Sequence, residues 1–165
     1  MKRMRNAVVA ILILLLTVAS LQPIAGAETT ENSAISKAEL QRMYTEYLIG
    51  EGYKPEIDKD GDIVFKREGR SYIIIIKEKD PEFFQLILPN FWAIESEEER
   101  ARVLVAADAS NAKSKYSKIY TVKDNVWVSM ELFVEKPDDF KQLFGRAMAA
   151  LANGLTNFVS KMREK

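Results

Sequence analysis

Three alternating aspartates form the part of this sequence that most resembles a metal site. Asp58, Asp60 and Asp62 follow one another at every second position, with Gly61 between the last two. A calcium-binding EF-hand loop begins with acids at this spacing, but it also needs a glycine at its sixth position and a glutamate at its twelfth. Here isoleucine and glycine stand at those positions. We therefore predict a tight hairpin turn on Asp60 and Gly61 with solvated acids, and no metal site.

Acidic residues also gather at the start of a predicted helix. Glu97, Glu98 and Glu99 could supply half of an acid–base or metal site, but the dipole of a helix favours acids in its first turn without any chemistry. Asp108 interrupts the apolar side of the same predicted helix. A buried carboxylate there would need a partner, and a position at the boundary with solvent is the commoner explanation.

Lysines alternate with tyrosines between residues 113 and 123, a pattern that can bind nucleic acid strands. The residues are Lys113, Lys115, Tyr116, Lys118, Tyr120 and Lys123. The whole chain has 24 basic and 24 acidic residues, and it becomes slightly acidic once its basic N-terminal segment is removed. Such a charge balance disfavours nucleic acids and anionic membranes as partners. We predict a solvated helix end followed by an edge strand.

Two absent residue types narrow the possible chemistry. The chain has no histidine and no cysteine. This excludes Ser-His and Cys-His nucleophiles, imidazole acid–base catalysis and the usual ligands of zinc, copper and haem. It also excludes disulfides, so hydrophobic burial must hold the domain together. We predict that the protein is not an enzyme and has no catalytic, cofactor-binding or metal-binding residue.

The first 27 residues have the order of a secretory signal peptide. A basic start, Met1 to Arg5, precedes an uncharged run from Ala7 to Leu21, and Ala25-Gly26-Ala27 fits the pattern that a signal peptidase cuts. The run is shorter than the roughly 20 residues of a membrane-spanning helix. We predict cleavage after Ala27, export to the periplasm or the extracellular space and no stable membrane anchor. Residues 28–35 would be a flexible lead-in, and residues 36–165 a single domain.

Within that domain, periodicity predicts three helices and a set of short strands. The first helix spans roughly 37–50, with a capping box of Ser36 and Glu39 at its start and Gly50 and Gly52 at its end. The second helix begins with a capping box of Ser96 and Glu99, and the third begins near Pro137. Expected strands are 62–67, 72–78, 83–94, 117–122 and 126–134, with 54–58 as a short candidate. A proline and asparagine at 89 and 90 should bulge the strand 83–94 or place it at an edge. The fold class is α+β, with an antiparallel sheet of about five strands and the order α-β-β-β-α-β-β-α.

Both faces of the predicted sheet are apolar. Along 126–134 the even-numbered residues fill one face, while Trp127 and Phe133 lie on the other; Phe83 and Ile87 oppose Phe84, Leu86 and Leu88 in the same way. Antiparallel sheets often leave one face polar and wet. A helix, a second copy of the chain or a bound partner could cover the second face. The candidate partner-binding residues are Trp127, Phe133, Phe83 and Ile87, and a small ligand or lipid on that face is the alternative.

Several turn residues and the order of elements resemble the YbjN family over nearly the whole mature chain. The matching patterns are Leu48…Gly52-Tyr53…Ile57-Asp58…Asp60-Gly61-Asp62-Ile63…Phe65 and Asn111…Lys118-Ile119-Tyr120…Asn125-Val126-Trp127. The resemblance implies a fold similar to type III secretion chaperones, with a twisted antiparallel sheet and frequent dimers, and no agreed activity. Those chaperones are cytosolic, so an export signal departs from the pattern. We expect an exported, chaperone-like module that binds a polypeptide or self-associates.

Overall fold

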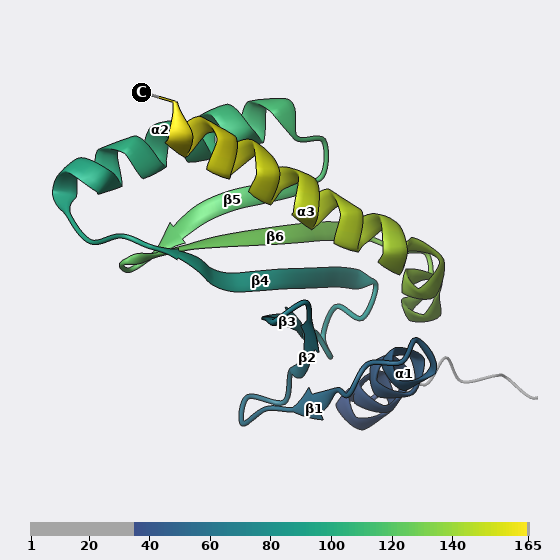
Figure 1. Cartoon of the computed structure of the whole chain (residues 1–165). Coiled ribbons are helices and arrows are strands. Elements are labelled where there is room, and N and C mark those ends of the chain that lie inside the picture. Colours follow the sequence, from purple (N-terminus) through teal and green to yellow (C-terminus); the bar gives the residue numbers. More distant parts are fainter. Residues whose placement is uncertain (1–34, 165) are drawn as a thin grey trace, which may run out of the picture. The chain divides into compact units, whose positions relative to one another are not determined.

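The computed structural model in Figure 1 describes residues 35–164, so the predicted signal peptide and nearly all of the lead-in lie outside the described residues. The helices are α1 (Lys37–Gly50), α2 (Glu97–Lys113) and α3 (Phe140–Arg163), the last preceded by a 3-10 turn, η1 (Pro137–Asp139). The strands are β1 (Glu56–Ile57), β2 (Ile63–Arg67), β3 (Arg70–Ile74), β4 (Phe83–Ala93), β5 (Ser117–Val122) and β6 (Asn125–Phe133).

All six strands form one antiparallel sheet in the order β1-β2-β3-β4-β6-β5. The predicted α+β class is confirmed, and the predicted order of helices and strands matches except that four strands, not three, precede α2. The count of about five strands is one short, because the two-residue β1 also pairs at the edge of the sheet. Strands β1 to β4 pair in succession as hairpins, and so do β5 and β6, as the short turns in the sequence predict. Strand β4 pairs with β6, although α2 and β5 lie between them in the chain.

The predicted capping box forms in full at the start of α1 but not at the start of α2. At α1 the capping box is complete: the Ser36 N–H donates to Glu39 Oε2 at 2.9 Å, and the Glu39 N–H donates to Ser36 Oγ at 3.3 Å. At α2 only half of it forms, because the Glu99 carboxylate accepts instead from Trp92 Nε1 at 3.0 Å and from the Glu95 N–H at 2.8 Å. The prediction of a full second capping box was therefore wrong.

The sheet has one bulge, and it lies where the sequence places it. The pairing of β4 with β6 shifts register between Leu88 and Trp92, and Asn90 has a φ of 51°. Because β4 lies between β3 and β6, the bulge and not an edge position accommodates the proline. Strand β3 ends earlier than predicted, since the Ile76 N–H donates to Asp62 Oδ1 at 2.8 Å instead of joining a strand ladder.

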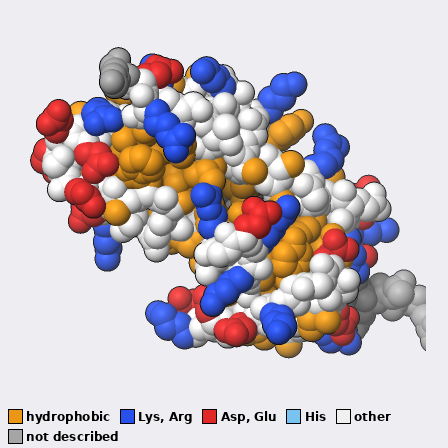
Figure 2. All heavy atoms as spheres, in the orientation of Figure 1, with side chains coloured by type: hydrophobic (Ala, Val, Ile, Leu, Met, Phe, Trp, Pro, Cys, Tyr) orange, Lys and Arg blue, Asp and Glu red, His pale blue; other side chains and the backbone are white. Residues whose placement is uncertain are grey.

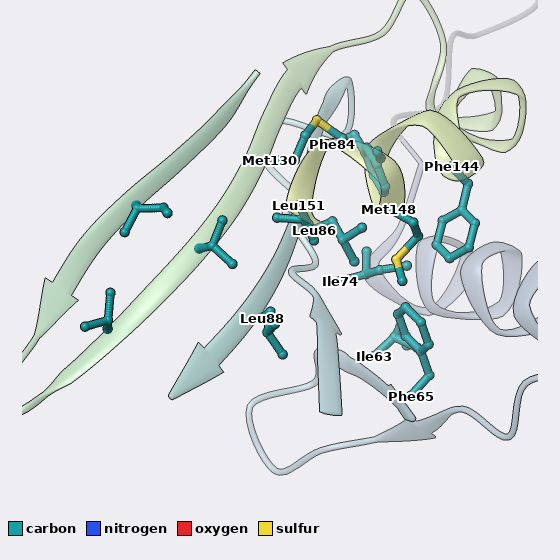
Figure 3. Packing of buried hydrophobic residues seen from close by; sticks show 14 of the residues in the cluster. Ile63, Phe65, Ile74, Phe84, Leu86, Leu88, Met130, Phe144, Met148 and Leu151 are labelled. Carbon is teal, nitrogen blue, oxygen red and sulfur yellow. The ribbon is translucent and has the colours of Figure 1, made fainter. Parts of the chain in front are cut away.

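The helices of the described domain pack on one face of the sheet. Helix α3 lies across β4, β5 and β6, α2 packs against α3 and β5, and α1 reaches β2 (Figure 1). The buried side chains of this face, such as Phe84, Leu86 and Met130, point toward α3 residues that include Met148 and Leu151 (Figure 3). The other face of the sheet has no helix over it among residues 35–164.

Candidate docking surface on the sheet

The face of the sheet away from the helices carries ten side chains on four neighbouring strands, and we call it the open face. Its members are Ile73, Phe83, Gln85, Ile87, Lys118, Tyr120, Trp127, Ser129, Glu131 and Phe133. They alternate with the core residues because successive side chains of a strand point to opposite faces. The open face therefore follows from strand alternation, but four of its ten members are polar, so the prediction of an apolar second face was only partly right.

Aromatic pairs lie at the two ends of the open face. Phe83 and Phe133 are register partners on β4 and β6, with ring centroids 5.2 Å apart, and Phe133 is 75% exposed. Tyr120 and Trp127 are register partners on β5 and β6, with centroids 6.3 Å apart. Trp127 Nε1 donates to Asn90 Oδ1 at 2.9 Å, which ties the indole to the bulge of β4. Both pairs thus offer rings in fixed orientations.

A polar network centred on Glu131 lies between the two aromatic pairs. Its carboxylate accepts three hydrogen bonds: from Ser129 Oγ at 2.8 Å, from Gln85 Nε2 at 3.0 Å and from Lys118 Nζ at 2.8 Å. Ser129 is 0% exposed although it lies on the open face, so its neighbours on the sheet cover it. The network is an ion pair whose carboxylate accepts two further hydrogen bonds, the arrangement that a partly buried charge requires.

Hydrogen bonding sets the charge state of this network. Burial raises the pKa of Glu131, but the hydrogen bonds from Lys118, Ser129 and Gln85 outweigh it and hold the pKa below its usual value. Glu131 is therefore ionised at neutral pH and balances the charge of Lys118. Three donors of the same chain bind its carboxylate, which fits a structural role in the centre of a surface.

This pKa shift predicts an acid dependence of stability. Because the folded pKa of Glu131 lies below the unfolded value of about 4.3, its contribution is fully present above that value and is lost as the pH falls through the folded pKa. We expect Glu131→Gln to be less stable than wild type at neutral pH in urea unfolding, and the difference to narrow as the pH falls below about 4. The exposed Glu135→Gln serves as control. A difference that stays constant with pH would contradict the network.

The four predicted partner-binding residues share this face, but they differ in exposure. Trp127, Phe83 and Phe133 are half-buried or exposed. Ile87 is 4% exposed between its register partners Ile73 and Ser129, so it offers a partner little contact area. Sequence reasoning missed the polar centre. Its only signal was the appearance of polar residues at alternate positions of an otherwise apolar strand.

The acidic segment forms a hairpin loop, but the loop spans Asp58 to Asp62 and is longer than the predicted turn on Asp60 and Gly61. Asp60 is exposed, whereas Asp58 and Asp62 are half-buried and accept hydrogen bonds from backbone N–H groups. Asp58 Oδ1 accepts from the N–H groups of Asp60 at 2.9 Å and Asp62 at 3.0 Å, and Gly61 has a φ of 85°. Within residues 35–164 no group of three or more acidic side chains is arranged to hold a metal ion. Asp108 is exposed on α2, as its expected position at the solvent boundary requires.

Charge is mixed over the surface. Positive and negative side chains are interspersed around apolar areas on the face seen in Figure 2. Nucleic-acid surfaces usually present a field of one sign. Of the alternating lysines and tyrosines, Lys118 and Tyr120 belong to the open face, with Lys118 Nζ 5.4 Å from the centre of the Tyr120 ring. The exclusion of nucleic acid as a partner stays a prediction.

No model of a protein family matches this chain, and no curated protein matches it. The resemblance to the YbjN family therefore stays a prediction. In the part of the chain that the structure describes, no helix combines the length and hydropathy needed to cross a bilayer.

Proposed function

We propose that this chain is an exported, non-enzymatic and chaperone-like binding protein that docks a polypeptide on the open face, and that a second copy of the chain is such a polypeptide. The observation that carries the proposal is the group of aromatic side chains, Phe83, Phe133 and Trp127, on a sheet face that no described helix covers. Export is supported by the N-terminal sequence pattern, and the non-enzymatic character by the absence of histidine and cysteine.

The composition of the open face suits recognition of another protein. Two aromatic pairs flank a polar centre on this face, and protein interfaces combine aromatic side chains with polar groups in this way. Aromatic side chains supply large contact areas at small entropic cost and are frequent hot spots. The Glu131 network between them would limit non-specific sticking, because a partner that covered it would have to remove water from the Lys118–Glu131 ion pair.

The arrangement is also self-complementary, which favours a second copy. A twofold axis through the middle of the open face would bring the Phe83–Phe133 pair of one copy over the Tyr120–Trp127 pair of the other.

A charge at the exposed ring tests the proposal. We expect Phe133→Asp to weaken self-association at least tenfold, since it buries a carboxylate against apolar rings, while the monomer keeps its cooperative unfolding. Sedimentation velocity over a wide range of concentrations measures the change. Leu104→Asp is the matched control, because Leu104 is another exposed apolar residue, 53% accessible, but lies on α2.

The controls make the outcome decisive. Wild type that associates, Phe133→Asp that does not and Leu104→Asp that behaves as wild type would support the open face. A wild type that stays monomeric at every concentration would contradict self-association. Loss of association in Leu104→Asp alone would move the interface from the sheet to α2.

A further inference from the structure

A small apolar pocket lies on the helix side of the sheet, where β5 stops short of the end of β6. Pairing of β5 with β6 ends at Ser117 and Met130, so the last residues of β6 have no β5 residue beside them. The side chains around the resulting space of about 140 Å³ are Tyr116, Met130, Leu132, Leu143, Ala147 and Ala150. The small alanines of α3 leave the space open, and the lining makes it apolar.

Cations surround the mouth of this pocket. Arg146 of α3 belongs to its lining and also to that of an adjoining hollow of about 450 Å³, which contains Lys113 and Lys115. Tyr116 and Ala150 also line both spaces, so the apolar pocket and the cationic hollow are adjacent. Within residues 35–164, none of the three cations is in an ion pair with an acidic side chain.

We propose that this pocket binds a small carboxylic acid that has one aromatic ring or a short alkyl chain. An enclosed apolar cavity of about 150 Å³ holds a benzene-sized molecule, so this space is large enough for one ring. The carboxylate would lie at the mouth, where Arg146 can donate two parallel hydrogen bonds and the lysines add attraction.

The site is independent of the proposed function. The open face uses odd-numbered residues of β6, while the pocket uses the even-numbered Met130 and Leu132 on the opposite side of the strand. An apolar pocket with few convergent polar groups is the usual form of a small-molecule site. Binding there would leave the aromatic pairs of the open face free.

Titration calorimetry with phenylacetate tests the proposal, with hexanoate as the alkyl probe and 2-phenylethanol as the uncharged counterpart. We expect saturable binding of both acids by wild type, and binding of 2-phenylethanol at least tenfold weaker, because it lacks the carboxylate. Arg146→Gln should weaken phenylacetate binding about tenfold. Ala150→Leu should abolish it by filling the pocket.

Two controls exclude trivial explanations. Arg163→Gln removes an exposed cation from the last turn of the same helix and should leave binding unchanged. Thermal melts show whether Ala150→Leu still folds; if it does not, the surface variant Arg146→Gln decides. Absence of saturable binding of both acids at millimolar concentrations would overturn the proposal. So would equal loss of affinity in Arg146→Gln and Arg163→Gln, which would indicate general charge attraction.

Discussion

Replacing Phe140 by alanine is expected to lower the free energy of unfolding by about 3–5 kcal/mol. Phe140 is 0% exposed at the start of α3, and its ring is 4.4 Å from that of Tyr44 and 5.5 Å from that of Phe84, centroid to centroid. It therefore joins α1, α3 and the covered face of the sheet. Removing the ring leaves a cavity where three elements meet, and urea unfolding measures the loss.

The same substitution on the open face provides the matched control. Phe133→Ala removes an identical side chain that is 75% exposed, and we expect a loss below about 1 kcal/mol in the dilute protein. If Phe140→Ala does not fold, Phe140→Leu gives a smaller and measurable loss in the same direction. Equal losses at residues 133 and 140 would show that the helices do not pack on the face described.

Gly154→Val is expected to lower the free energy of unfolding by about 1–3 kcal/mol through overpacking. Gly154 lies in α3 directly over β5, where an added Cβ would be 2.3 Å from Ser117 Oγ and 3.0 Å from Ser117 Cβ. The Gly154 carbonyl also accepts from Ser110 Oγ of α2 at 2.9 Å, so the three elements meet closely at this residue. A valine would force α3 away from the sheet.

Another glycine of the same helix gives the control. A Cβ at Gly145 would have no heavy atom within 4 Å, so Gly145→Val should change stability little or raise it slightly through helix propensity. Thermal and urea unfolding of both variants would give the comparison. Adding Ser117→Gly to Gly154→Val should recover part of the loss. Equal stability of the two valine variants would contradict the close packing of α3 on β5.

Local elements of this fold could be predicted because their signals are local. The first helix begins and ends where Ser36, Glu39 and the following glycines indicate, and residues 89 and 90 mark the bulge of β4. The prediction of a second capping box was wrong because a residue outside the motif binds the carboxylate of Glu99. The indole of Trp92, close in sequence but outside the capping motif, donates to the Glu99 carboxylate that the motif assigns to Ser96.

The candidate site depends on contacts that the sequence does not display. Trp127, Phe133 and Phe83 could be assigned to one face by strand alternation, but which face the helices cover depends on how α1, α2 and α3 pack. The polar centre joins Gln85 to Glu131, which are 46 residues apart, and needs the register of β4 with β6. The apolar pocket depends on the register at which β5 ends.

Fluorescence quenching of Trp127 tests most directly whether the open face is a docking surface. The chain has two tryptophans, and Trp92→Phe leaves Trp127 as the only one, on the open face. Acrylamide quenching is then measured in dilute and in concentrated samples whose oligomeric state is known from sedimentation. The account predicts that quenching of Trp127 falls severalfold on association, because the second copy covers the indole. Association with unchanged quenching would place the interface elsewhere and contradict the account.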